Sequence, residues 1–252
     1  MGLFDKKYCS ICDEKIGLLG NRKLSDGNLC KDCAAKLSPW FSERRESTVE
    51  QIREQLAYRE ANREKVEAFH VTKTIGTSTK VLLDEDSQVF MVTSARKWKE
   101  ANPDVIRFAD VTGCEIKTDE SRSEVRFKNE QGEYTSYSPK RYKYSYNIRV
   151  LIYVNNPYFS EIEFRLNDFS IDIGEPGLSL FGGRQQAPRP MDNPVFRLWM
   201  ERAEEIRSIL ADIREEAREN AVPKQPVVCR ACGATTTPDA SGCCEYCCTP
   251  LI

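Results

Sequence analysis

The distribution of cysteine constrains this chain more than any other feature of its sequence. Eleven cysteines and a single histidine occur in 252 residues. Ten of the cysteines form two terminal clusters, which are Cys9, Cys12, Cys30 and Cys33, and then Cys229, Cys232, Cys243, Cys244, Cys247 and Cys248. Only Cys114 lies between them. A disulfide scaffold needs an oxidising compartment and an even number of cysteines, so metal binding explains the spacing better.

The first cluster consists of two Cys-x-x-Cys pairs, Cys9–Cys12 and Cys30–Cys33. Each pair presents two thiolates to one ion at about 2.3 Å, and two pairs complete a tetrahedral four-cysteine zinc site. The intervening residues predict two short strands with a turn at Asp26-Gly27, and residues 31–37 predict a helix. Residues 1–40 are therefore expected to form a treble-clef-like zinc domain whose metal supplies most of its stability. Two redox-active pairs are the alternative, but no thioredoxin-like βαβ context surrounds them.

The second cluster offers six thiols for four ligand positions. We assign Cys229, Cys232, Cys244 and Cys247 because only these form two Cys-x-x-Cys pairs, and we expect a zinc ribbon over residues 227–252. Gly233 suits the left-handed residue that closes a knuckle, and Cys248 occupies the same position in the second knuckle, which implies mild strain. Cys243 and Cys248 are then spare thiols, and an exchange of either with an assigned ligand stays open.

Between the clusters, the first predicted element is a helix over residues 47–69 that connects the zinc domain to the centre of the chain. Ser47-Thr-Val-Glu50 matches a capping box, in which Ser47 caps the first turn and Glu50 bonds back. Arg59 and Arg63 interrupt its apolar positions. We therefore expect this helix to be only partly buried.

Residues 71–173 are rich in Val, Ile, Phe and Thr in short runs, which predicts strands. The expected strands cover residues 71–75, 80–83, 89–93, 105–108, 111–117, 124–127, 144–155, 161–167 and 169–173. Turn residues separate them, including Asp119 to Ser121 between the fifth and sixth.

A loop over residues 174–192, rich in Gly and Pro, precedes a long predicted helix over residues 193–218. Asn193-Pro194 supplies a cap followed by proline at the first helical position. Apolar residues then recur every three or four positions, at Val195, Trp199, Ala203, Ile206, Leu210, Ile213 and Ala217. This stripe predicts a helix packed on the preceding sheet. Residues 219–228, with two prolines, predict a linker to the ribbon.

Antiparallel strands followed by one amphipathic helix resemble the pleckstrin-homology-like (PH/GRAM) architecture, here over residues 70–218. Lys80-Val-Leu-Leu-Asp-Glu-Asp-Ser-Gln-Val-Phe-Met-Val and Val105-Ile-Arg-Phe-Ala-Asp-Val look like opening strands of bacterial GRAM/PH-like domains. The segment Cys9-Ser-Ile-Cys-Asp-Glu-Lys-Ile-Gly-Leu-Leu-Gly-Asn-Arg-Lys-Leu, with Cys30-Lys-Asp-Cys33, closely resembles a small zinc-domain family of unknown function from Gram-positive bacteria and their phages. These resemblances imply an α+β multidomain protein and bring no catalytic residues.

The sequence contains few residues or motifs that could act in catalysis. It has no phosphate-binding glycine loop, no HExxH and no GxSxG motif. His70 is the only imidazole, and pairing it with Cys114 as a nucleophile has no support in the spacing. Four thiolates at each metal also leave no position for water. We therefore expect a protein that is not an enzyme.

Two basic and aromatic segments are candidate binding surfaces, residues 96–99 and residues 138–147. Cations bind phosphates and aromatic rings stack on bases, so such segments can contact single-stranded nucleic acid or anionic lipid headgroups. Solvated hairpin ends of ordinary β domains have a similar composition. The candidate contacts are Arg96, Lys97, Trp98, Lys99, Lys140, Arg141, Tyr142, Lys143 and Tyr144.

Charge and hydropathy favour a cytoplasmic protein that binds other proteins. The formal net charge is −2, from 37 basic and 39 acidic residues, which excludes a generic polyanion-coating protein. No run approaches the ~18 apolar residues of a membrane helix, and the N-terminus does not resemble a signal peptide. We expect an adaptor whose zinc modules present surfaces to protein partners or to another copy of the chain. The alternative is nucleic-acid or phospholipid binding through the two basic and aromatic segments or the N-terminal zinc domain.

Overall fold

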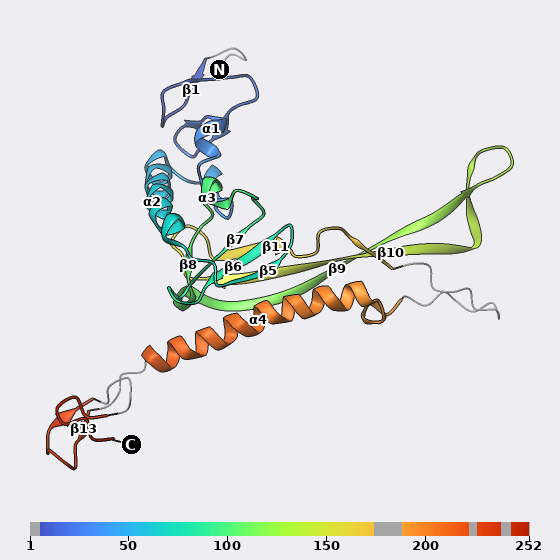
Figure 1. Cartoon of the computed structure of the whole chain (residues 1–252). Helices are drawn as coiled ribbons and strands as arrows, with labels where there is room; N and C mark the ends of the chain where they lie inside the picture. Colours follow the sequence, from blue (N-terminus) through green and yellow to red (C-terminus); the bar gives the residue numbers. More distant parts are fainter. Residues whose placement is uncertain (1–5, 174–187, 222–225, 238–242, 252) are drawn as a thin grey trace. The chain divides into compact units, whose positions relative to one another are not determined.

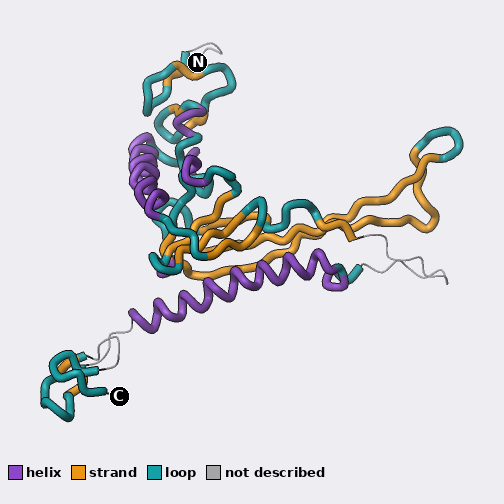
Figure 2. Tube along the Cα trace, viewed as in Figure 1, coloured by secondary structure: helices purple, strands orange, loops and turns teal. Residues whose placement is uncertain are grey.

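The computed structural model describes residues 6–173, 188–221, 226–237 and 243–251, and side chains of the long C-terminal helix up to residue 212. The described residues form both helices and antiparallel sheets, so the fold class is α+β, as predicted (Figures 1 and 2). The chain divides into two compact units, Met1–Asp212 and Ile213–Ile252. Each unit is described by itself below.

The first unit begins with two small hairpins and a short helix. Its elements are β1 (Lys7–Tyr8), β2 (Lys15–Ile16), β3 (Arg22–Lys23), β4 (Asn28–Leu29) and α1 (Lys31–Ala34). β1 pairs with β2 and β3 with β4, so four strands form here where the sequence predicted two. The turn expected at Asp26-Gly27 is confirmed, because the amide of Leu24 donates to the carbonyl of Gly27 at 2.9 Å. A Cβ atom at Gly27 would lie 2.6 Å from the Val49 side chain, so this close approach requires glycine.

The connecting helix α2 (Val49–Ala68) follows a 3₁₀ turn, η1 (Glu43–Arg45). Its capping box is one residue later than predicted: Thr48 accepts from the amide of Gln51 at 3.3 Å, and the Gln51 side chain accepts from the amide of Thr48 at 2.8 Å. The prediction of Ser47 and Glu50 was wrong, because the Ser47 hydroxyl already donates to the carbonyl of Glu43 at the end of η1.

α2 contributes to two hydrophobic clusters. Near its beginning, Ile52 is fully buried among the apolar and cysteine side chains of residues 9–37. Near its end, Val66 packs with Leu82 and Met91. The helix thus packs both on the cysteine-containing hairpins and on the sheet that follows.

The expectation that Arg59 interrupts the buried face of α2 was wrong. Arg59 is buried, and its Nη1 lies 2.7 Å from Oδ1 of buried Asp104. Asn62, also fully buried, donates to Pro103 and accepts from the amide of Val105. The helix therefore buries polar side chains because the segment after residue 101 supplies their partners, a contact that helical periodicity does not encode.

The first sheet is an antiparallel meander of four strands. They are β5 (Lys73–Gly76), β6 (Lys80–Asp84), β7 (Val89–Thr93) and β8 (Ile106–Arg107), in the order β5-β6-β7-β8. The helix α3 (Trp98–Ala101) and the 3₁₀ turn η2 (Phe108–Asp110) lie on either side of β8 in the sequence. Each strand predicted between residues 71 and 108 is present with small shifts at its ends.

The second sheet is built around one long strand. β10 (Tyr134–Val154) pairs with β9 (Val111–Lys128) on one side, and with β11 (Glu161–Arg165) and β12 (Ile171–Ile173) on the other. β11 and β12 reach no further back along β10 than Tyr144. Before that residue β9 and β10 continue as a two-stranded ribbon, drawn in green in Figure 1.

The turn predicted at Asp119 to Ser121 was wrong, and with it the division of this region into separate strands 111–117 and 124–127. Asp119 and Ser121 pair across the ladder with Asn147 and Ser145. Cross-strand partners satisfy the polar side chains, since Arg149 lies 2.7 Å from Asp119. Turn-forming residues therefore remain in a strand here because the opposite strand supplies their partners.

The first unit ends with the beginning of α4 (Pro194–Ala221), which follows the 3₁₀ turn η3 (Pro190–Asp192). The predicted cap is confirmed, because Oδ1 of Asn193 accepts from the amides of Val195 and Phe196 at 2.9 and 3.1 Å. Buried residues recur along one face, at Phe196, Trp199, Ala203, Ile206 and Leu210.

This face of α4 packs on the second sheet, since the Phe196 ring contacts that of Tyr146 edge to face at 5.7 Å. Val195 was predicted on the same stripe but is half exposed. The other two predicted stripe residues, Ile213 and Ala217, fall outside the described side chains. Residues 174–187 of the predicted loop fall outside the described residues as well.

The second unit contains the end of α4 and a small hairpin, β13 (Val227–Val228) and β14 (Thr235–Thr236), with a bridge between Cys243 and Pro250. α4 continues to Ala221, so the helix includes the first part of the predicted linker 219–228. In the described part of the chain, no helix is both long and apolar enough to cross a membrane.

Candidate metal centres

The four N-terminal cysteines converge on one point. The Sγ atoms of Cys9, Cys12, Cys30 and Cys33 all lie within 4.8 Å of one another, and those of Cys12 and Cys30 are 3.7 Å apart. Disulfide sulfurs would be ~2.05 Å apart. Four ligands at about 2.3 Å from a tetrahedral ion lie ~3.8 Å from each other. The spacing therefore fits four thiolates around one metal ion.

A tight knuckle positions the first two sulfurs. The amide of Cys9 donates to the carbonyl of Glu14, and the amide of Asp13 donates to the carbonyl of Cys9, both at 2.9 Å. Asp13 closes the knuckle with a left-handed backbone, φ 59°. The left-handed conformation of Asp13 was not predicted from the sequence, although Asp is among the few non-glycine residues that adopt it readily.

The other two sulfurs come from the start of α1. Cys30 is the N-cap residue, and its Sγ accepts from the amide of Cys33 at 3.3 Å. The amide of Cys30 in turn donates to Sγ of Cys9 at 3.3 Å. Backbone amides thus point at the sulfurs, which stabilises their negative charge as thiolates.

The C-terminal cluster has the same composition. The Sγ atoms of Cys229, Cys232, Cys244 and Cys247 lie within 4.8 Å of one another. Cys229 and Cys247 are separated by 3.5 Å, and Cys232 and Cys244 by 3.6 Å. These are the four residues assigned from the Cys-x-x-Cys spacing. Cys243 and Cys248 are not part of the group.

Both knuckles of the C-terminal cluster repeat the geometry of the first. The amide of Gly233 donates to the carbonyl of Cys229, and the amide of Cys248 donates to that of Cys244, each at 2.8 Å. Gly233 has φ 75° and Cys248 has φ 57°. The predicted left-handed position of both residues is confirmed. Three knuckles in one chain therefore share one backbone design.

Hydrogen bonds lower the pKa of two thiols, one in each cluster. Burial raises the pKa of Cys9, but amides of Cys12, Cys30 and Ile11 outweigh it and lower that pKa to about 6. A hydrogen bond with Thr249 lowers the pKa of Cys247 to about 6. Burial raises the pKa of Cys33. A divalent cation among the sulfurs would favour the thiolate at all four positions.

Most residues of the candidate surface at residues 96–99 already contact neighbouring side chains. Trp98 packs edge to face on Phe69, with ring centroids 5.9 Å apart. Lys97 forms an ion pair with Glu100 at 2.9 Å, and Lys99 forms one with Glu67 at 3.5 Å. The segment thus contains paired cations, with Arg96 exposed beside them.

Residues 138–147 lie inside β10 rather than at the end of a hairpin. Lys140 pairs with Glu124 at 3.6 Å, and Lys143 with Asp172 at 2.5 Å. The guanidinium of Arg141 stacks on the ring of Tyr137, and that of Arg122 stacks on the ring of Tyr142. Tyr144 is buried and does not present its ring to solvent.

Cys114 and His70 lie in different settings. Cys114 faces Ile152 across the ladder of β9 and β10, and burial raises its pKa to about 11, opposite to the shift of an activated nucleophile. His70 is exposed, with Nδ1 3.7 Å from a carboxylate oxygen of Asp86. The contacts of the described residues do not bring the two side chains together.

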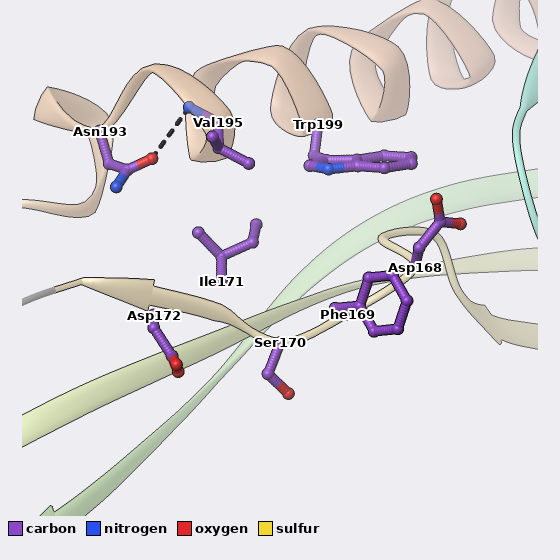
Figure 3. A pocket seen from close by; sticks show the side chains of 8 residues that line it. All are labelled: Asp168, Phe169, Ser170, Ile171, Asp172, Asn193, Val195 and Trp199. Atoms are coloured by element: carbon purple, nitrogen blue, oxygen red, sulfur yellow. Dashed lines mark hydrogen bonds between the residues drawn. The ribbon is translucent and has the colours of Figure 1, made fainter.

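A shallow pocket of about 300 Å³ lies beside the start of α4. Figure 3 shows Val195 and Trp199 of the helix facing Ile171 and its neighbours. The two carboxylates at its edge are already bonded: Asp168 accepts from the hydroxyl of Thr77, and Asp172 from Ser145. The sequence did not predict this pocket. Its two carboxylates accept hydrogen bonds from other parts of the protein and thereby stabilise the fold.

The comparisons with known proteins concern the N-terminal region. A family model described as "Domain of unknown function (DUF4428)" matches residues 7–55, which contain the first four-cysteine cluster and the start of α2. This agrees with the resemblance of that segment to a zinc-domain family of unknown function. No curated protein and no solved structure matches the chain.

Proposed function

We propose that this protein is a non-catalytic adaptor whose two four-cysteine clusters bind zinc and thereby hold interaction surfaces for protein partners. The observation that carries the proposal is the donor set. Each cluster brings together four sulfurs at tetrahedral spacing, on knuckles whose backbone amides support thiolates. Four thiolates are typical of structural zinc, whereas catalytic zinc keeps a position for water.

The small size of the hairpins supports a structural role for the metal. Strands β1 to β4 and β13 and β14 contain two residues each. Elements of this length cannot bury a core of their own, so metal binding and folding are coupled. In this proposal the N-terminal region is a treble-clef-like domain, residues 70–218 are a PH-like domain and the C-terminal region is a zinc ribbon.

The remaining groups favour recognition over catalysis. The half-buried thiol of Cys114 has a raised pKa, and the His70 imidazole is exposed. Most cations assigned to the basic and aromatic segments already contact carboxylates or rings. We therefore favour protein partners over nucleic acid, and we place the protein in the cytoplasm, where thiols remain reduced.

The test is affinity capture from the native host with three zinc-loaded full-length proteins. They are the wild type, C9S/C12S and C229S/C232S, each checked for its remaining zinc. The adaptor account predicts at least one protein that binds the wild type and is lost with only one of the two variants. Recovery of nucleic acid that nuclease removes, without any protein that depends on a cysteine pair, would contradict it.

A further inference from the structure

The turn between β2 and β3 carries the most exposed apolar side chains among the described residues. The amide of Gly20 donates to the carbonyl of Gly17 at 3.0 Å, which closes a four-residue turn with Leu18 and Leu19 at its corner. Leu18 is 94% exposed and Leu19 is 89% exposed. The two adjacent leucines form an exposed apolar patch, which makes this turn a candidate interaction site.

The turn is held in place from both sides. Ile16, immediately before it, is buried in the cluster that contains the cysteines. After it, Nη1 of Arg22 donates to the carbonyl of Leu19 at 3.3 Å, and Nδ2 of Asn21 donates to the side chain of Asn28 at 2.9 Å. The leucines therefore project from a supported backbone.

Cations flank the leucines along the chain and lie on the neighbouring strand. Residues 15–23 include Lys15, Arg22 and Lys23 and no carboxylate, and the nearest carboxylates along the chain are Asp13, Glu14 and Asp26. Lys7 lies opposite Ile16 on the neighbouring strand β1. On the other side, Arg44 donates to the carbonyl of Lys23 at 3.0 Å. Burial lowers the pKa of Arg44, and the nearby charges of Arg22 and Arg45 add to that shift.

We propose that this leucine turn, residues 17–20, docks the protein on an anionic lipid surface. Leu18 and Leu19 enter the boundary between headgroups and acyl chains, while Lys15, Lys23 and neighbouring cations contact lipid phosphates. An apolar tip with a basic rim matches a membrane interface, where long cationic side chains keep their charge in water. A polyanion such as RNA would use the rim but would gain nothing from the leucines. This inference does not depend on the proposed protein partners.

The experiment measures binding of the zinc-loaded full-length protein to phosphatidylcholine vesicles with and without phosphatidylserine, by co-sedimentation. We expect binding only with phosphatidylserine, weakening as salt rises. L18S/L19S is expected to lower partitioning by about 100-fold, from the lost burial of two leucines. K15Q/K23Q is expected to lower it by about 30-fold. F169S is the matched control, because Phe169 is 84% exposed elsewhere, and it should bind like the wild type.

A second measurement tests insertion directly. In L18W, the added tryptophan fluorescence should shift to the blue with phosphatidylserine vesicles, relative to the wild type. Absence of binding to these vesicles would overturn the proposal. Binding that K15Q/K23Q abolishes and L18S/L19S leaves unchanged would also overturn it, since that pattern describes a polyanion site without insertion.

Discussion

The left-handed residue that closes each knuckle gives a sharp test of the ligand assignment in the C-terminal cluster. Gly233 and Cys248 occupy equivalent positions, with φ 75° and φ 57° and the same hydrogen bond to the first cysteine of their pair. A side chain in this conformation costs ~1–2 kcal/mol, and glycine avoids the cost. Reciprocal substitutions should therefore change zinc affinity in opposite directions.

Gly233→Ala introduces the strain in isolation, because a Cβ atom there meets no heavy atom within 4 Å. We expect a loss of ~1 kcal/mol, or about fivefold weaker zinc binding at this site, since metal binding and local folding are coupled. Cys248→Gly removes the strain, and we expect about fivefold tighter binding.

The assay is competition with a chelator on the full-length protein, in which each proposed zinc site should release its ion in a step of its own. Each substitution should move one step and leave the other in place. The opposite sign for Cys248→Gly would refute the reasoning: a loss of 100-fold or more would mean that Cys248 is a ligand in place of Cys247. An unchanged affinity in Gly233→Ala would show that the backbone there does not hold the metal site.

Three further predictions concern the first unit. Asp104→Ala leaves the buried guanidinium of Arg59 without its carboxylate, so it should lower the free energy of unfolding by ~3–5 kcal/mol in urea titration. The control Glu100→Ala removes an exposed ion pair and should lower it by less than ~1 kcal/mol. Burial of Asp84 raises its pKa, but two backbone amides outweigh it and lower the pKa overall. Stability from this carboxylate is thus present above its unfolded pKa and lost as pH falls through the folded pKa. Asp84→Asn should therefore make the melting temperature fall less steeply at acid pH. An unchanged acid limb of the melting-temperature profile would contradict the assignment. Gln51→Ala should destabilise the fold more than Glu50→Ala in thermal melts, because only Gln51 completes the capping box; equal effects would argue against the cap.

The metal clusters were predictable because their signal is local. Three of the four Cys-x-x-Cys pairs form a knuckle, and the position after the second cysteine indicates the left-handed residue, as at Gly233 and Cys248. The fourth pair, Cys30 and Cys33, lies at the start of α1 instead. Asn193 before Pro194 likewise marked the start of α4, since a cap depends on neighbours in sequence. The four-cysteine groupings followed from spacing alone.

Predictions failed where distant residues decide the structure. Asp119 to Ser121 has the composition of a turn, but pairing with residues 145–147 keeps it in a strand. An arginine in a helix is expected at an exposed position, but Arg59 is buried because Asp104, far along the chain, forms an ion pair with it. Single-residue preferences are weak compared with such tertiary contacts.

The central claim is that each chain holds two zinc ions, one in each four-cysteine cluster. Elemental analysis of freshly isolated full-length protein, combined with native mass spectrometry, measures this directly. We predict two zinc atoms for the wild type, and one each for C9S/C12S and C229S/C232S. A wild-type protein with fewer than two bound atoms, or a cysteine-pair variant that retains both, would contradict the account.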